Sequence, residues 1–178
     1  MTDFLPKGTE IPAKVSKFLI LEIGKNVIRA MSSAKAGWEW WAKDEAGDLK
    51  PYRVKSLDEV PPSVKKATHH KEQAHYFWAF MVWNVGLEAV QLLEITQVSI
   101  LRQIEALLND SDWGSIKDYD IVIEKKKTGS RASDVEYTVL PRPKKKAPPE
   151  AFFIYENMLV DLEKLFEGKS PFKKVDFE

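Results

Sequence analysis

The stretch His75–Asn84, HYFWAFMVWN, is aromatic or aliphatic at nearly every position. Read as a β-strand, it places successive side chains on opposite faces. One face carries Tyr76, Trp78, Phe80 and Val82, and the other carries His75, Phe77, Ala79, Met81 and Trp83. A strand with one solvated face should instead alternate apolar with polar residues. Two apolar faces on one strand therefore require an explanation.

The surrounding sequence predicts further strands and two helices. Thr96 is expected to cap a helix whose apolar face repeats at helical spacing and which ends at 109–112. A second helix is expected at 149–167, with an apolar stripe, and Gly168 stops it. Gly86, with Val85, is expected to form a hairpin turn, and the polar, proline-punctuated region 44–74 a long loop. The predicted strands are 18–23, 26–32, 38–43, 76–84, 87–95, 119–123 and 135–139.

This order of elements predicts a mainly β protein. A five-stranded antiparallel barrel with a helix between its third and fourth strands, the OB-fold, has the same order. In such a barrel one strand face fills the core while the outer face can act as a stacking platform. We predict an irregular N-terminal arm (1–16), an OB-fold domain (17–146), and a segment with a Pro-rich linker, a C-terminal helix and a short acidic tail (147–178).

Composition excludes several kinds of site. The 178 residues include no cysteine, so disulfides, Cys-ligated zinc and thiol nucleophiles are absent, and two of the three histidines are adjacent. We therefore expect no metal and no cofactor. The longest apolar run, Tyr76–Trp83, is far shorter than the ~20 residues of a membrane helix, and no signal peptide is visible. The expected location is the cytoplasm.

Charge and aromatic residues favour a polyanion partner. The chain has 27 basic and 27 acidic residues, but 120–146 holds eight Lys/Arg against four Asp/Glu, whereas 147–178 holds four against seven. Aromatic rings on a sheet can stack bases without reading sequence, and nearby cations can neutralise phosphates. The predicted DNA-binding residues are Trp38, Trp40, Trp41, Tyr76, Trp78, Arg29, Lys50, Arg53, Lys125, Lys127 and Arg142.

Other interpretations of the same residues stay open. A tryptophan on an alternating strand is more often core than platform, and the lysine runs at 125–127 and 144–146 are typical of solvated segments. A β-barrel protein-interaction module without nucleic-acid binding is the main alternative. Catalytic motifs are absent, and Glu39 and Glu94 have no companion acid at a telling position, so no enzyme activity is expected.

Five segments, in order and spacing, resemble single-stranded DNA-binding proteins of tailed bacteriophages and their prophages. They are GWEWW, HYFWAFMVWN, LLEITQVSILRQIEALL, DWGSIKDYDIVI and EYTVLPRP, and the likeness covers residues 17–146. It implies an OB-fold that coats single-stranded DNA during phage replication and recombination, without catalysis. One branch of that family carries a structural zinc, which this cysteine-free chain does not share.

The C-terminal helix has two possible roles. Its apolar stripe must be covered, either by the barrel of the same chain or by another protein. In the second case it would mediate self-association or bind a replication or recombination protein.

Overall fold

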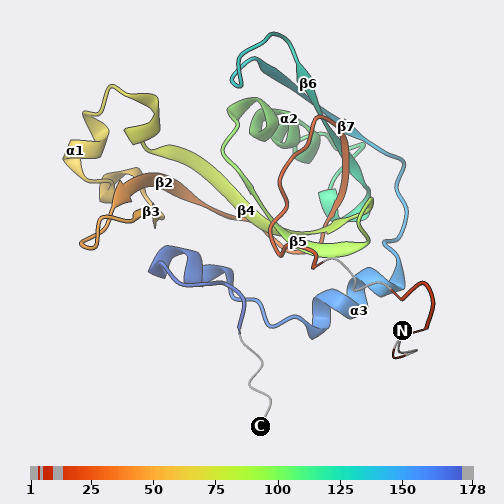
Figure 1. The fold of residues 1–178 in the computed structure, drawn as a ribbon. Coiled ribbons are helices and arrows are strands. Elements are labelled where there is room, and N and C mark those ends of the chain that lie inside the picture. The colour runs from red at the N-terminus through yellow and green to blue at the C-terminus, as the bar shows by residue number, and fades with distance from the viewer. Residues whose placement is uncertain (1–3, 5, 10–13, 174–178) are drawn as a thin grey trace.

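The computed structural model describes residues 4, 6–9 and 14–173. Its centre is one seven-stranded antiparallel sheet (Figure 1). The strands run in the order β3-β2-β4-β1-β6-β7, and β5 pairs with β4 outside this path. Their bounds are β1 (Gly24–Ala30), β2 (Lys35–Lys43), β3 (Leu49–Val54), β4 (His75–Asn84), β5 (Ala89–Ile95), β6 (Ile121–Lys127) and β7 (Val135–Pro141).

Short helices connect and cover the strands. The α-helices are α1 (Pro62–Lys65), α2 (Val98–Leu108) and α3 (Pro149–Asn157). The 3₁₀ helices are η1 (Leu57–Glu59), η2 (His70–Glu72), η3 (Ile116–Asp118) and η4 (Leu162–Glu167). In the part of the chain that the structure describes, no helix has the length and apolarity needed to span a bilayer.

Strand β4 organises the sheet. Its first half pairs with β2, its last three residues pair with β1, and β5 follows its other edge. β1 and β2 therefore lie end to end beside β4. At the bend between them, the Met31 N–H donates to the Met81 carbonyl, and Ser32 Oγ accepts from the Met81 N–H at 2.9 Å.

The sheet is not closed into a barrel, unlike the predicted fold. The edge of β5 is occupied by the N-terminal segment, since Leu19 N–H donates to the Leu92 carbonyl at 2.9 Å. The edge of β7 is occupied by α2, whose Gln103 accepts from Val139 N–H at 2.8 Å and donates to the Tyr137 carbonyl at 3.0 Å. The mainly β class, the helix between β5 and β6, and a helix near the C-terminus are confirmed.

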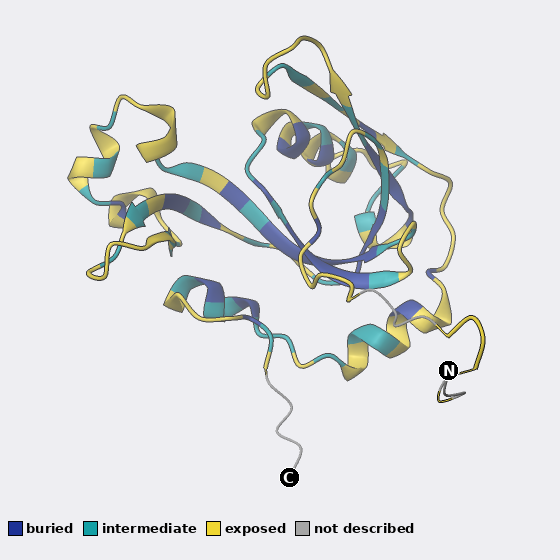
Figure 2. Cartoon of the chain, in the orientation of Figure 1, coloured by how far each residue is buried: buried dark blue, intermediate teal, exposed yellow. Residues whose placement is uncertain are grey.

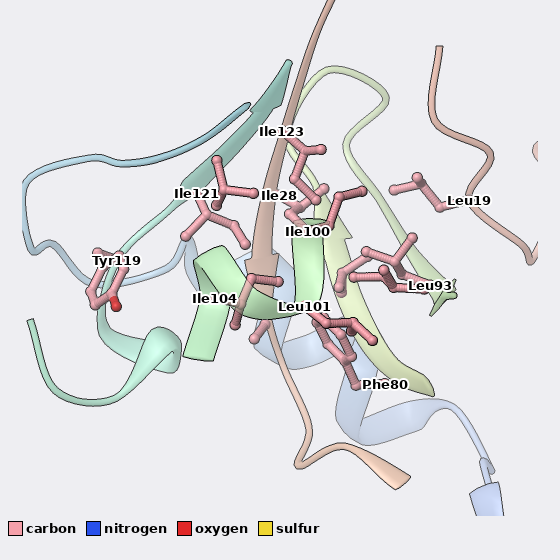
Figure 3. Packing of buried hydrophobic residues seen from close by; sticks show 14 residues of the cluster. Leu19, Ile28, Phe80, Leu93, Ile100, Leu101, Ile104, Tyr119, Ile121 and Ile123 are labelled. Atoms are coloured by element: carbon pink, nitrogen blue, oxygen red, sulfur yellow. The ribbon is translucent and has the colours of Figure 1, made fainter. Parts of the chain in front are cut away.

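Both faces of β4 are buried from Ala79 to Trp83, because two separate cores lie against them (Figure 2). Phe80 and Val82 join a core with α2, in which Phe80 and Leu93 lie near Ile100, Leu101 and Ile104 (Figure 3). The opposite face packs against C-terminal residues instead, through Phe77, Ala79, Met81 and Trp83. The second apolar face thus has its partner within the chain.

The C-terminal segment crosses the side of the sheet opposite α2 (Figure 1). The predicted single helix at 149–167 is wrong: Met158 is extended, with φ −83° and ψ 128°, and Asp161 starts η4 by accepting from the Glu163 N–H. Leu162 and Leu165 are buried. Glu163 pairs with both Lys35 and Lys55 at 2.7 Å, and these cations lower its pKa to about 2. The sheet of the same chain therefore covers the part of the predicted apolar stripe that lies in η4.

Several predicted boundaries differ from the structure. The region 44–74 is not one loop, because it contains β3, whose Pro51 is tolerated at the sheet edge. Residues 18–23 form only an isolated bridge at Phe18, and β1 begins at Gly24. The β4–β5 loop spans 85–88, and Glu88, not Gly86, has a positive φ. The predicted N-terminal arm and acidic tail lie partly outside the described residues.

The predicted cap of α2 is also wrong. Gln97, not Thr96, occupies the N-cap position, and no side chain there bonds the first turn. The helix is held by packing of Ile100, Leu101 and Ile104 in the core. Amphipathic packing commonly outweighs a missing cap.

Candidate nucleic-acid interface

Three aromatic side chains form a row across β2 and β4, which we call the aromatic row: Trp38, Tyr76 and Trp78. Trp38 is the direct cross-strand partner of Tyr76, and their ring centroids are 5.4 Å apart. Trp78 lies two residues along the same face of β4, and its Nε1 donates to the Tyr76 hydroxyl at 3.3 Å. Tyr76 is 39% exposed, and Trp38 and Trp78 are half-buried. The row therefore offers ring surface outside the core.

Packing holds the row in place. Trp78 contacts the core on one side and lines a cavity of about 390 Å³ on the other. That cavity lies beside the end of α2 and η3, with Leu108, Ile116 and Lys117 in its wall. Because the strand and the core fix the indole, little rotamer entropy would be lost when a flat ligand stacks on it.

Lys117 lies in the wall of the cavity that Trp78 also lines, and its Nζ donates to Ser33 Oγ at 3.3 Å. Lys117 is absent from the predicted set. It follows α2 on a short 3₁₀ helix, so neither strand alternation nor distance along the chain indicates that it lines a cavity with Trp78.

The other two predicted tryptophans lie elsewhere. Trp40 is buried and stacks on Tyr52 of β3, with centroids 5.9 Å apart and an interplanar angle of 17°. Trp41 is 45% exposed, and its Nε1 donates to Glu39 Oε1 at 3.1 Å. Since Trp38 and Trp41 are three residues apart on a strand, they face opposite sides of it. Trp40, two residues from Trp38, shares the face of Trp38 but is buried against Tyr52, so Trp38 is the predicted β2 tryptophan that offers ring surface beside Tyr76.

Arg29 is placed in the interior, not on a binding surface. Its side chain is 1% exposed, and its Nε donates to Asp120 Oδ1 at 2.9 Å. Its Nη1 donates to the Lys117 carbonyl at 3.3 Å. A phosphate on the surface therefore does not reach this guanidinium in the described conformation, and we remove Arg29 from the predicted DNA contacts.

The remaining predicted cations do not converge on the aromatic row. Lys50 pairs with Asp44 at 2.7 Å in the β2–β3 turn, with its side chain exposed. Lys125 donates to the Leu21 carbonyl, and Lys127 to the Arg131 carbonyl in the β6–β7 hairpin. Arg142 is exposed at the end of β7.

Arg53 belongs to a buried ionic cluster with Glu39 and Glu94. Its Nε donates to Glu39 Oε2 and its Nη2 to Glu94 Oε2, both at 2.8 Å, and its guanidinium lies 5.8 Å from the Phe77 ring centroid. Glu39 and Glu94 therefore bind the same arginine, whereas the sequence predicted no acidic partner for either. Arg53 uses its Nε and Nη2 in these two ion pairs, and its side chain is only 13% exposed. No group of three or more His, Asp or Glu suited to a metal occurs among the described residues.

Glu94 should make stability depend on pH. Burial, then the hydrogen bond and charge of Glu39, raises the pKa of Glu94 to about 8, although Arg53 opposes this. With a raised folded pKa, the stabilisation is complete below about pH 4.5 and is lost as the pH rises through 8. We expect Glu94→Gln to increase the free energy of unfolding at pH 9 by about 2 kcal/mol and to change it little at pH 5.

Urea denaturation at the two pH values would measure this difference. Glu105→Gln, at an exposed position of α2, is the matched control and should leave the pH dependence unchanged. Equal pH profiles for wild type and Glu94→Gln would contradict the raised pKa.

Comparisons of the chain with models of protein families, with curated proteins and with solved structures find no match.

Proposed function

We propose that this chain binds single-stranded DNA without strong sequence preference and without catalysis. The observation that carries the proposal is the aromatic row, in which Trp38, Tyr76 and Trp78 share one face of the sheet, and Lys117 lines the cavity next to Trp78. Every base has a π-face, so a row of rings can accept successive unpaired bases whatever their identity. Lysine beside the rings would neutralise a phosphate and make binding dependent on salt.

The order of strands supports an OB-type fold for this role. If β1 and β2 count as one bent strand and the β3 hairpin as an insertion, five strands remain, with α2 between the third and the fourth. These five are β1–β2, β4, β5, β6 and β7. OB-folds bind oligonucleotides on a comparable sheet surface. From the resemblance, we propose that the protein protects single strands during phage replication and recombination in the host cytoplasm.

A fluorescence titration with poly-dT tests the proposal directly. We expect binding to quench the tryptophan emission, because two of the three rings in the row are indoles. The affinity should fall steeply as salt rises, with log K linear in log salt concentration. Titration of the same strand annealed to poly-dA is the control and should give a weaker quench, since paired bases cannot stack on the row. Absence of a signal with single strands at low salt would favour the protein-interaction module.

A further inference from the structure

A second surface lies beyond Lys117, between η3, the linker 144–148 and α3. We call it the basic groove. It has a volume of about 830 Å³, and its main lining residues are Lys117, Lys144, Lys145, Lys146, Phe152 and Phe153. The linker is held in place, because the Lys145 N–H donates to the Asp118 carbonyl at 3.1 Å and the Arg142 N–H donates to the Asp120 carbonyl at 2.9 Å. The groove is thus part of the fold.

One wall of the groove is aromatic. Helix α3 packs against the sheet through Ala151, Ile154 and Tyr155, and this leaves Phe152 and Phe153 on the groove side. They are 47% and 69% exposed. Two adjacent exposed phenylalanines give this wall aromatic surface on which a flat ligand can stack.

The remaining walls carry a net positive charge. The lining holds four exposed lysines against two acidic side chains, Asp118 and Glu156, and the fifth cation, Arg29, is neutralised by buried Asp120. Arg29 contributes to the lining, and its Nη2 is buried without a hydrogen-bond partner among the described residues. Asp120 divides its charge between Arg29 Nε at 2.9 Å and Lys145 Nζ at 3.4 Å. The local potential therefore favours an anion.

The groove and the cavity beside Trp78 have one lining residue in common. Lys117 lies in the wall of both, so the two hollows are neighbours around η3. An anionic chain that stacks on Trp78 would pass Lys117 and enter the groove. A ligand with alternating phosphates and flat bases matches both the lysines and the phenylalanines.

We infer that the basic groove is a second subsite for the same single strand of nucleic acid. Its lysines neutralise phosphates, while Phe152 and Phe153 stack bases that lie beyond the aromatic row. The inference rests on the proposed function. It predicts a longer binding site than the row alone provides, so strands of about 16 nucleotides should bind more tightly than strands of about 6, which reach only the row.

The test compares these two lengths of oligo-dT on the full chain. The Lys144→Gln/Lys146→Gln variant should bind the short strand like wild type but show a salt slope smaller by about 1.4 on the long strand. The Phe152→Ala/Phe153→Ala variant should lose about 5-fold or more in affinity for the long strand only. Lys65→Gln/Lys66→Gln, which makes the same charge change at exposed positions in and after α1, is the control and should behave like wild type.

The outcomes separate this inference from the proposed function. If both groove variants bind the two lengths as wild type does, the subsite is overturned while the proposed function stands. If wild type binds neither length, both are overturned. If poly-glutamate binds through Lys144 and Lys146 while the long strand gains nothing over the short one, the groove takes an acidic protein segment and our inference is wrong.

Discussion

Replacing Trp38 and Tyr76 together by alanine is expected to weaken binding to poly-dT by about 30-fold or more. Each base that stacks on an aromatic side chain contributes about 1–3 kcal/mol, and the variant removes two such platforms. Neither ring belongs to the two buried cores, so the variant should keep its fold. Fluorescence anisotropy of a labelled strand would give the affinity, and circular dichroism would verify the fold.

Trp41→Ala is the matched control for this experiment. Trp41 is an exposed indole on the same strand, but it faces away from Trp38 and contacts Glu39. We expect its affinity for poly-dT to stay within about 2-fold of wild type, since it removes no ring from the row. If Trp41→Ala loses the affinity while the double variant keeps it, DNA meets the opposite face of β2 and the aromatic row is not the site.

Replacing Arg29 by methionine is expected to lower the free energy of unfolding by about 3–5 kcal/mol. Arg29 is 1% exposed and Asp120 is 5% exposed at the side chain, so the substitution would leave a buried carboxylate without its main partner. Lys145, at 3.4 Å from Asp120 Oδ2, would neutralise only part of that charge from the surface. Urea denaturation at pH 7 measures the change.

Arg142→Met is the control, because Arg142 is exposed and uses only its backbone N–H toward Asp120. Its effect should stay within about 0.5 kcal/mol. In the double variant Arg29→Met/Asp120→Asn, part of the lost stability should return, since the unpaired charge is then absent. A loss below 1 kcal/mol for Arg29→Met would show that the ion pair does not stabilise the fold.

The candidate site was only partly predictable from sequence. Trp38, Tyr76 and Trp78 follow from aromatic alternation on two strands, but the choice between Trp38 and Trp41 depends on the pairing of Trp38 with Tyr76. Lys117 and the basic groove depend on the packing of η3 beside β1 and of α3 against β5, which no local sequence pattern indicates. Arg29 is of a residue type that often binds phosphate, yet the carboxylate of Asp120, 91 residues away in the chain, pairs with it in the interior.

Residues Glu39 and Glu94 illustrate the same limit. Each is one acid in an apolar strand, and the sequence contains no sign that they meet. In the sheet, Glu39 of β2 is opposite Arg53 of β3. The Arg53 side chain extends across β4 and binds Glu94 on β5. Strand register therefore created an ionic cluster from residues that are isolated in the sequence.

The sequence by itself determined the local elements: the doubly apolar strand β4, the amphipathic helix α2 and the mainly β class. These follow from side-chain periodicity, which depends only on neighbouring residues. Tertiary structure alone decided that the sheet stays open, that the C-terminal segment covers the second face of β4, and which rings and cations remain exposed. Those outcomes depend on contacts between segments far apart in the chain, because the elements that pack on a strand decide which of its side chains are buried and which stay exposed.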